Sequence, residues 1–153
     1  MAWESKPVYK GKVTIGTDLV LGMGVWSWSG FSREMIEDLE FFDDYDDYVA
    51  GLVRCGKVTF SGQYKKDDSR GQTYLISCML NGTELTSIRF WVDASSYYIP
   101  NSTSSTAAIG GLPANTPVGH VKVESVDINY SGLGALGDIS FVVQLCKAPL
   151  RFT

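Results

Sequence analysis

The stretch RCGKVTFSGQYKKDDSRGQTYLISCMLNGTELTSIRFWVD, residues 54–93, decides the fold class because it changes periodicity twice. Apolar and polar residues alternate with a period of two in 54–64 and again in 85–93, and this pattern predicts two β-strands. The apolar members of that alternation are Val58, Phe60, Ile88, Phe90 and Val92.

Between these strands, the sequence predicts one amphipathic helix over about residues 69–80. Its apolar residues recur at helical spacing, and Asp68 or Ser69 is the expected N-cap. Asn81-Gly82 follows the last turn, where a glycine commonly ends a helix. The apolar residues of the predicted helix are Tyr74, Leu75, Cys78 and Met79.

Further strands are predicted on both sides of this unit. Residues 8–16 and 24–31 alternate in the same way, and the glycine-containing turn between them predicts that they form a hairpin. Residues 33–41 fit either a helix or a strand, and we favour a strand, followed by a short helical turn in 43–49 that ends at Gly51. Residues 121–130 and 138–146 are the last two predicted strands.

These elements predict a mainly β protein: one domain over residues 1–153, built as an antiparallel β-sandwich or barrel with one packed α-helix. The length of 153 residues is enough to bury a substantial core. Turn or cap positions are expected for three glycines, Gly51, Gly62 and Gly82.

Charge is concentrated in one part of the chain. Residues 33–47 contain eight acidic residues and one basic residue, a local charge of −7 in a protein of net charge −4. Four of these acids lie in FFDDYDDYVAG, residues 41–51, as Asp43, Asp44, Asp46 and Asp47. The remainder is mildly basic, so copies of the chain can attract one another, although a solvated acidic face is an equally good interpretation.

The acidic stretch does not have the pattern of a calcium-binding loop. When the loop is started at Asp44, its fifth, sixth and twelfth positions are Tyr48, Val49 and Cys55 instead of an acid, a glycine and a glutamate. We therefore expect no metal site and no cofactor.

No catalytic motif stands out elsewhere. The three cysteines (Cys55, Cys78 and Cys146) and the single His120 have no metal-binding spacing, and the odd cysteine count favours a reducing compartment. The start of the chain lacks the apolar segment of a secretory signal, and no stretch reaches membrane-spanning length. The expectation is a non-enzyme that is made in a cytoplasm.

The ordered series of motifs resembles the tail tube (major tail) proteins of long, non-contractile-tailed bacteriophages. The residues that carry the resemblance are YVAGL (48–52), GKVTFSGQY (56–64), GQTYL (71–75), NGTELTSIRFWVDASSYYIP (81–100) and the strand pair VKVESVDINYSG and GDISFVVQL. Together they extend over about two thirds of the chain. Residues 36–40, IEDLE, depart from the family pattern.

The resemblance implies a structural virion protein without enzymatic activity. Its copies would form hexameric rings that stack into a tube around a tape-measure protein, with a tail terminator and tail-tip or baseplate proteins at the ends. DNA would pass through the bore without tight binding, and no membrane would be involved. The protein would reside in the virion tail, after assembly in the host cytoplasm.

Two sets of residues are the predicted contact sites. The acidic set, Asp43, Asp44, Asp46 and Asp47, would face the bore or an axial neighbour. The segment 97–119 and the turn at 17–25 would contact the next ring. Candidate residues in the long segment are Tyr97, Tyr98, Asn101 and Leu112.

Other classes remain open at this point. A capsid decoration or adaptor protein would also be small, β-rich and free of catalytic motifs, and the inner tube of a contractile injection system would share the ring architecture. A carbohydrate-binding module would use its aromatic residues as a stacking platform, although such residues more often form cores and interfaces. The candidates for a platform are Trp26, Trp28, Trp91, Tyr97 and Tyr98.

Overall fold

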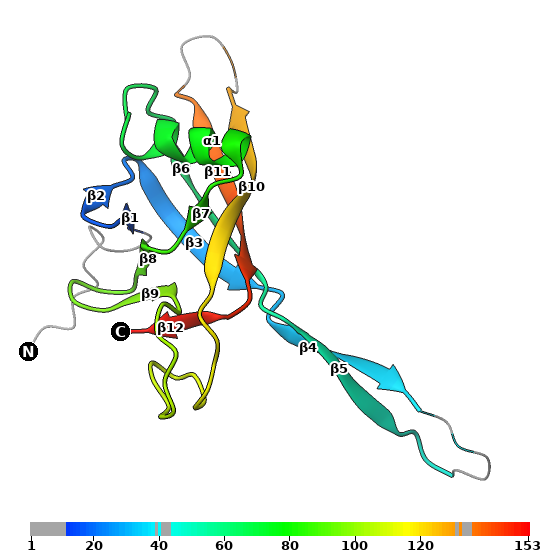
Figure 1. The fold of residues 1–153 in the computed structure, drawn as a ribbon. Coiled ribbons are helices and arrows are strands. Elements are labelled where there is room, and N and C mark those ends of the chain that lie inside the picture. Colours follow the sequence, from blue (N-terminus) through cyan, green and yellow to red (C-terminus); the bar gives the residue numbers. More distant parts are fainter. Residues whose placement is uncertain (1–11, 39, 41–43, 131, 133–135) are drawn as a thin grey trace, which may run out of the picture.

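The computed structural model describes residues 12–38, 40, 44–130, 132 and 136–153. Every strand pair in these residues is antiparallel. Figure 1 shows a body that contains two sheets and one helix, and a long two-stranded ribbon that leaves it. The predicted mainly β, antiparallel fold with one helix is confirmed.

The first sheet has five strands in the order β12-β9-β8-β1-β2. Its members are β1 (Val13–Ile15), β2 (Asp18–Leu19), β8 (Ile88–Trp91), β9 (Tyr97–Pro100) and β12 (Leu150–Phe152). The second sheet has five strands in the order β3-β6-β11-β10-β7. Its members are β3 (Met23–Ser29), β6 (Lys57–Gln63), β7 (Glu84–Leu85), β10 (His120–Asn129) and β11 (Asp138–Cys146).

The core lies between the two sheets. Phe60 of β6 stacks on Phe141 of β11, with ring centroids 5.1 Å apart, and meets Phe90 of β8 across the sheets at 5.7 Å. All three rings are fully buried. Burial of large aromatic side chains is a major source of stability in a domain of this size, so these rings hold the two sheets together.

The helix α1 (Gln72–Asn81) closes the core. Leu75 and Cys78 face inward and belong to the same buried cluster as the sheet residues. The helix ends at Gly82 in the left-handed conformation (φ 66°), which confirms the predicted C-cap. At the other end the N-cap is Gly71 instead of Asp68 or Ser69, yet the buried Asp68 carboxylate still accepts a hydrogen bond from the Gln72 N–H at 3.1 Å.

A buried polar cluster fixes the helix start to the sheets. The Gln72 amide donates to the carbonyls of Leu21 (2.7 Å) and Gln63 (2.9 Å) and accepts from the Lys65 N–H (2.8 Å). Asp68 also accepts from the Leu21 N–H at 2.9 Å. The buried polar groups are thereby satisfied, as folded interiors require.

The predicted hairpin of residues 8–16 with 24–31 is wrong. Within the described residues, β1 pairs with β2 and β8, whereas β3 pairs with β6 in the other sheet. Strand alternation is a local property, but the choice of partner is made by distant parts of the chain. The predicted strand 85–93 also divides, because β7 joins the second sheet and β8 the first.

The predicted helical turn near residues 43–49 is also wrong for the residues that the structure describes. Tyr48–Arg54 is the strand β5, which pairs with β4 (Ser32–Glu37), so the strand prediction for 33–41 is confirmed over residues 33–37. Gly51 consequently lies inside β5 and ends no helix.

Gly62 lies within β6, not at a turn or cap. A side chain at this position would collide with the backbone of Gly22 and Met23 on β3 and the turn before it. The close approach of two backbones therefore requires glycine here.

Candidate functional site: the arm and its base

The largest unexplained feature of the molecule is the arm, defined as β4, β5 and the described residues between them. Figure 1 shows the arm projecting far from the body. Every residue of β4 is exposed, and every residue of β5 except Gly51 is exposed as well. A two-stranded hairpin is at best marginally stable in water when nothing covers it, so the arm has the character of a segment that is completed by a partner.

Two glycines shape the root of the arm. Gly30 precedes β4 and Gly56 precedes β6, with φ of 78° and 91°. A side chain on Gly56 would collide with the carbonyl of Ser29, because the outgoing and returning chains cross there. Positive φ and close backbone approach both demand glycine. The arm therefore leaves the body through a tight crossing of its two strands.

Apolar side chains lie on both faces of the arm. Ile36 and Val49 are directly opposed and share one face, while Met35 and Ala50, one position along each strand, share the other. Met35 is 60% exposed and Leu52 67% exposed. Apolar groups on both sides of a ribbon fit a segment that lies between other protein surfaces, since contiguous exposed apolar surface marks interaction sites.

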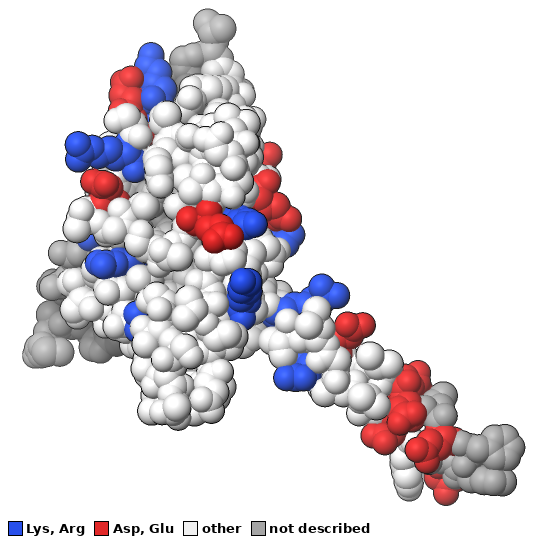
Figure 2. Space-filling model, viewed as in Figure 1, with Lys and Arg blue, Asp and Glu red and all other residues white. Residues whose placement is uncertain are grey.

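The far end of the arm is acidic. We define the arm tip as residues 44–47, which contain Asp44, Asp46 and Asp47, all exposed. Asp43 lies outside the described residues. Figure 2 shows acidic groups toward the far end of the arm and basic groups where it joins the body. Between the three acids of the tip, Tyr45 is 88% exposed.

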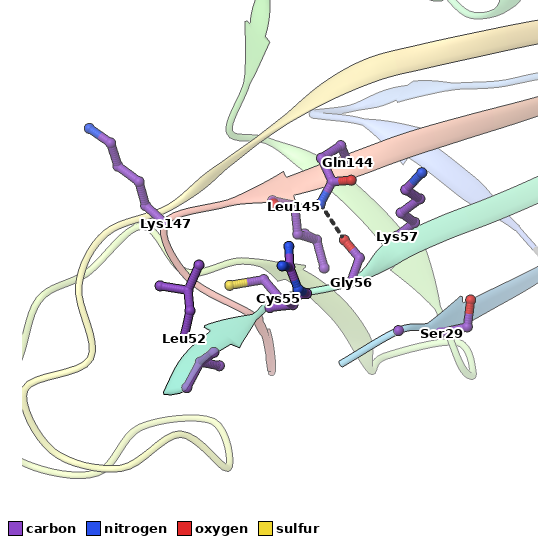
Figure 3. A pocket seen from close by; sticks show the side chains of 11 residues that line it. Ser29, Leu52, Cys55, Gly56, Lys57, Gln144, Leu145 and Lys147 are labelled. Atoms are coloured by element: carbon purple, nitrogen blue, oxygen red, sulfur yellow. Dashed lines mark hydrogen bonds between the residues drawn. The ribbon is translucent and has the colours of Figure 1, made fainter. Parts of the chain in front are cut away.

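An open pocket lies at the base of the arm, where it joins the second sheet. Its volume is about 620 Å³, within the range of about 300–1,000 Å³ typical of binding sites. Figure 3 shows its side chains gathered between the end of β5 and the end of β11, with Lys147 on the outer side. We call it the arm-base pocket, and its lining residues are Ser29, Gly30, Leu52, Val53, Arg54, Cys55, Gly56, Lys57, Gln144, Leu145 and Lys147.

Two neutral polar side chains at the arm-base pocket donate hydrogen bonds within the subunit. The Gln144 amide donates to the carbonyls of Gly56 and Leu145, both at 3.0 Å, and the Trp28 indole donates to the carbonyl of Cys55 at 2.9 Å. Burial and the neighbouring Cys146 raise the pKa of the Cys55 thiol. A thiol with a raised pKa stays protonated near neutral pH, which makes Cys55 a poor nucleophile.

The predicted inter-ring residues separate into two kinds. Asn101 is buried and its side chain donates to the carbonyl of Pro117 at 2.8 Å, and Leu112 is also buried. Both therefore hold the long segment together within the subunit. Tyr97 and Tyr98 belong to β9 and are partly exposed. Other members of the segment, such as Pro113 and Val118, are exposed and remain available for contacts.

The aromatic residues pack on one another and on the core. Trp26 lies 5.6 Å from Phe90 and 5.8 Å from Tyr98, and Trp91 lies 4.7 Å from Tyr97, all measured between ring centroids. The Trp26 indole donates to the carbonyl of Trp91 at 3.0 Å, across the two sheets. Their placement supports the interpretation of these rings as packing residues rather than a sugar platform.

Clusters suited to metal binding are not found in the described residues: no group of three or more His, Cys, Asp or Glu there could hold an ion. His120, with a side chain that is 13% exposed, has its Nε2 3.5 Å from the Glu84 carboxylate. None of the three cysteines forms a disulfide. A search for helices able to cross a membrane, made over the same residues, finds none.

The arm is the functional feature that sequence reasoning missed. The sequence shows the acidic stretch, but it predicts a helical turn over 43–49, whereas the strand β5 begins at Tyr48. The sequence feature that indicates a hairpin is the pair Gly30 and Gly56, which lie on either side of residues 31–55. Two glycine turns about 25 residues apart, around an apolar segment on each side of an acidic centre, are consistent with a long hairpin.

Solved structures with the same fold come from tails and injection machines. A chain from the tail of an empty gene transfer agent particle with C6 symmetry superposes with a TM-score of 0.62 at 12% identity, covering 99% of both chains. A chain from the six-fold symmetrised baseplate of the anti-feeding prophage gives 0.60 at 8% identity, covering 100% of this chain and 97% of that one. A chain from the extended sheath–tube complex of the PVC extracellular contractile injection system gives 0.55 at 12% identity, covering 99% and 93%.

These likenesses show that the fold is tail-tube-like. They cover nearly the whole of each chain, so the shared architecture is not a local motif. No family model matches the sequence, and no curated protein matches it either.

Proposed function

We propose that this chain is the tube subunit of a bacteriophage tail, and that six copies form a ring which stacks into a hollow tube for DNA. The observation that carries the proposal is an exposed two-stranded arm on a tail-tube-like fold. The C6 symmetry of the gene transfer agent tail supports a six-membered ring.

Exposed surfaces on the subunit favour a ring. The apolar faces of the arm need a partner, and β3 is an edge strand of the second sheet, with Val25 exposed on it. Exposed edges and apolar ribbons favour association with other chains. A head-to-tail contact between unlike patches repeats until the rotation closes a ring.

The outward face of the second sheet supplies a suitable bore wall. The first sheet and α1 contribute to one buried cluster on the other face, so the outward positions carry mostly polar and charged side chains, Lys57 and Lys122 among them. One cross-strand row there is Val25, Ser61, Ser140 and Asp127. The two lysines pair with carboxylates, Lys57 with Glu124 at 2.8 Å and Lys122 with Glu84 at 4.0 Å, so they would offer DNA phosphates little counterion release.

The axial contacts are assigned by the same reasoning. The exposed part of the segment 101–119 and the turn at 17–25, where Leu19 and Leu21 are exposed, would contact the next ring. Such contacts predict slower amide hydrogen exchange in these two segments in the tube than in the free subunit. Equal exchange rates in both forms would remove them from the axial interface.

The wider assembly follows from the proposal. A tape-measure protein would occupy the tube during construction, and terminator and tip or baseplate proteins would bind its two ends. The similar solved structures include chains from a tube terminator complex and from a tube-terminating cap. The subunit would then reside in the tail of the virion.

A second candidate is the inner tube of a contractile injection system. The similarity to the anti-feeding prophage chain, with a TM-score of 0.60, is close to that for the gene transfer agent tail, at 0.62. A contractile machine needs a sheath that grips the outside of the tube, whereas a non-contractile tail does not. Isolation of the native particle and a search for a sheath layer around the tube distinguish the two.

Electron microscopy of the concentrated protein in negative stain, with its mass from light scattering, tests the proposal directly. Rings with six-fold averages or hollow tubes are the expected result. A protein that decorates capsids would instead remain a monomer or small oligomer and bind a capsid lattice. Absence of rings and tubes, both alone and after addition of tail-tip complexes, would overturn the proposal.

A further inference from the structure

The arm-base pocket carries cationic groups that the subunit does not use. Lys57 pairs with Glu124 at 2.8 Å, so its charge is compensated. Arg54 and Lys147, both exposed, form no ion pair with any residue that the structure describes. Beside them the pocket offers the apolar side chains of Leu52, Val53 and Leu145. A ligand that matches this lining combines negative charge with an aromatic or aliphatic group.

The arm tip has that chemistry. Asp44, Asp46 and Asp47 surround Tyr45, the most exposed large side chain among the described hydrophobic residues. Tyrosine is a favoured anchor at protein interfaces because it buries a large area at a small entropic cost. The tip thus presents an aromatic anchor between carboxylates, and the pocket presents an apolar floor between cations.

A molecule cannot place its own tip in its own pocket. The paired strands of the arm stand between the two, and β5 alone has seven residues, which at about 3.3 Å each extend over about 20 Å. Figure 1 shows the arm leading away from the body throughout its length. The complementary surfaces are therefore available only to another copy.

We propose that the arm tip of one copy docks into the arm-base pocket of a second copy, with Tyr45 as the anchor and with Arg54 and Lys147 facing the acids of the tip. This inference deepens the proposed function and rests on it, since it names the contact that joins neighbouring subunits. The contact is head to tail: each copy gives a tip and receives one. Such a contact propagates around a ring or along a stack.

Photo-crosslinking tests the position of the tip. Tyr45 is replaced by p-benzoylphenylalanine in the full chain, the concentrated protein is irradiated, and the crosslinked peptides are identified by mass spectrometry. Crosslinks between copies to Leu52, Leu145 or neighbouring lining residues are expected. Crosslinks to another surface, or none between copies, would overturn the proposal. Leu80 on α1, which is 75% exposed and lies outside the proposed contacts, is replaced in the same way as the control and should give no crosslinks to the pocket.

A charge exchange tests the electrostatic part. Arg54→Glu with Lys147→Glu is expected to weaken self-association by about tenfold or more, as reversal of charges facing an acidic partner does. Adding Asp44→Lys and Asp46→Lys to the same chain should restore most of that loss. The matched control is Lys65→Glu with Lys66→Glu, which reverses two exposed charges on the body. If both double reversals weaken association equally, or the exchange gives no rescue, the docking is wrong.

The two experiments separate this inference from the proposed function. If rings form but Tyr45 crosslinks outside the arm-base pocket, the chain is still a tube subunit and the docking proposal is wrong. If Tyr45 crosslinks to the pocket but the copies form open filaments instead of closed rings, the docking is correct and the proposed hexameric ring is wrong. Association through this contact should also fall as salt increases, because the facing charges are screened.

Discussion

The body and the arm of this molecule differ in how they bury their strand residues. In the body, strands alternate buried and exposed residues, and Phe60, Phe90 and Phe141 are completely enclosed. In the arm, adjacent strands of similar length bury none of their described residues. Body strands are stabilised by their own chain, whereas the arm exposes apolar groups that only another surface can cover. The difference supports the proposal that the body provides the folding stability and the arm provides a contact to another subunit.

The largest change in stability is expected from a substitution that creates a cavity in the core of the body. Phe60→Ala is expected to lower the free energy of unfolding by about 3–5 kcal/mol, because it removes a ring that contacts both sheets. Chemical denaturation of the monomeric protein measures the change. A loss below about 1 kcal/mol would mean that the two sheets do not depend on this core.

A smaller loss is expected at the polar cluster of the helix start. Gln72→Leu leaves the carbonyls of Leu21 and Gln63 and the Lys65 N–H without their partner. The cost should be about 2 kcal/mol or more, since buried groups without hydrogen bonds are destabilising. Thermal unfolding compared with Thr73→Ala, a change at the exposed neighbouring position, provides the measurement. Equal melting temperatures for the two variants would contradict the role given to Gln72.

The helix end should contribute less. Gly82→Ala places a side chain in the left-handed conformation and is expected to cost about 1 kcal/mol. Apart from the chain neighbours, no described atom lies within 4 Å of the position of the added carbon, so the cost is conformational and not steric. Gly82→Asn should lose less than Gly82→Ala, because asparagine tolerates this conformation better. The reverse order in denaturation would contradict this explanation.

The smallest effect on folding is expected in the arm. Ile36→Ser should change the free energy of unfolding of the monomer by no more than about 0.5 kcal/mol, because Ile36 is already half exposed. The same variant should form rings and tubes less readily, measured by light scattering and microscopy under identical conditions. A large loss of monomer stability without any effect on assembly would reverse the comparison between body and arm.

Much of the body was predictable because its signals are local. The period-two alternation in 54–64 became β6, the helical spacing in 69–80 became α1, and Asn81-Gly82 became its cap. Each of these patterns is complete within a dozen residues, and burial of one face enforces it. The acidic stretch was equally visible, since charge is read directly from composition.

The arm was harder to predict because burial does not shape it. In YVAGLVR, residues 48–54, apolar side chains occupy both faces of the ribbon, so the alternation that identifies a half-buried strand is absent. Gly51 then resembled a helix end although it lies within a strand. Gly62 was misassigned for a related reason: its requirement comes from the backbone of Gly22, 40 residues away.

By itself, the sequence determined the fold class, the single helix, and the concentration of negative charge in one short segment. The tertiary structure alone decided which strands pair, that β1 and β3 belong to different sheets, and that the described acids lie at the end of an arm that has exposed cations at its base. The physical reason is the separation along the chain of the residues that interact. Periodicity and charge are properties of neighbouring residues, whereas strand partners, backbone crossings and the separation of tip from pocket depend on contacts between residues far apart in the chain.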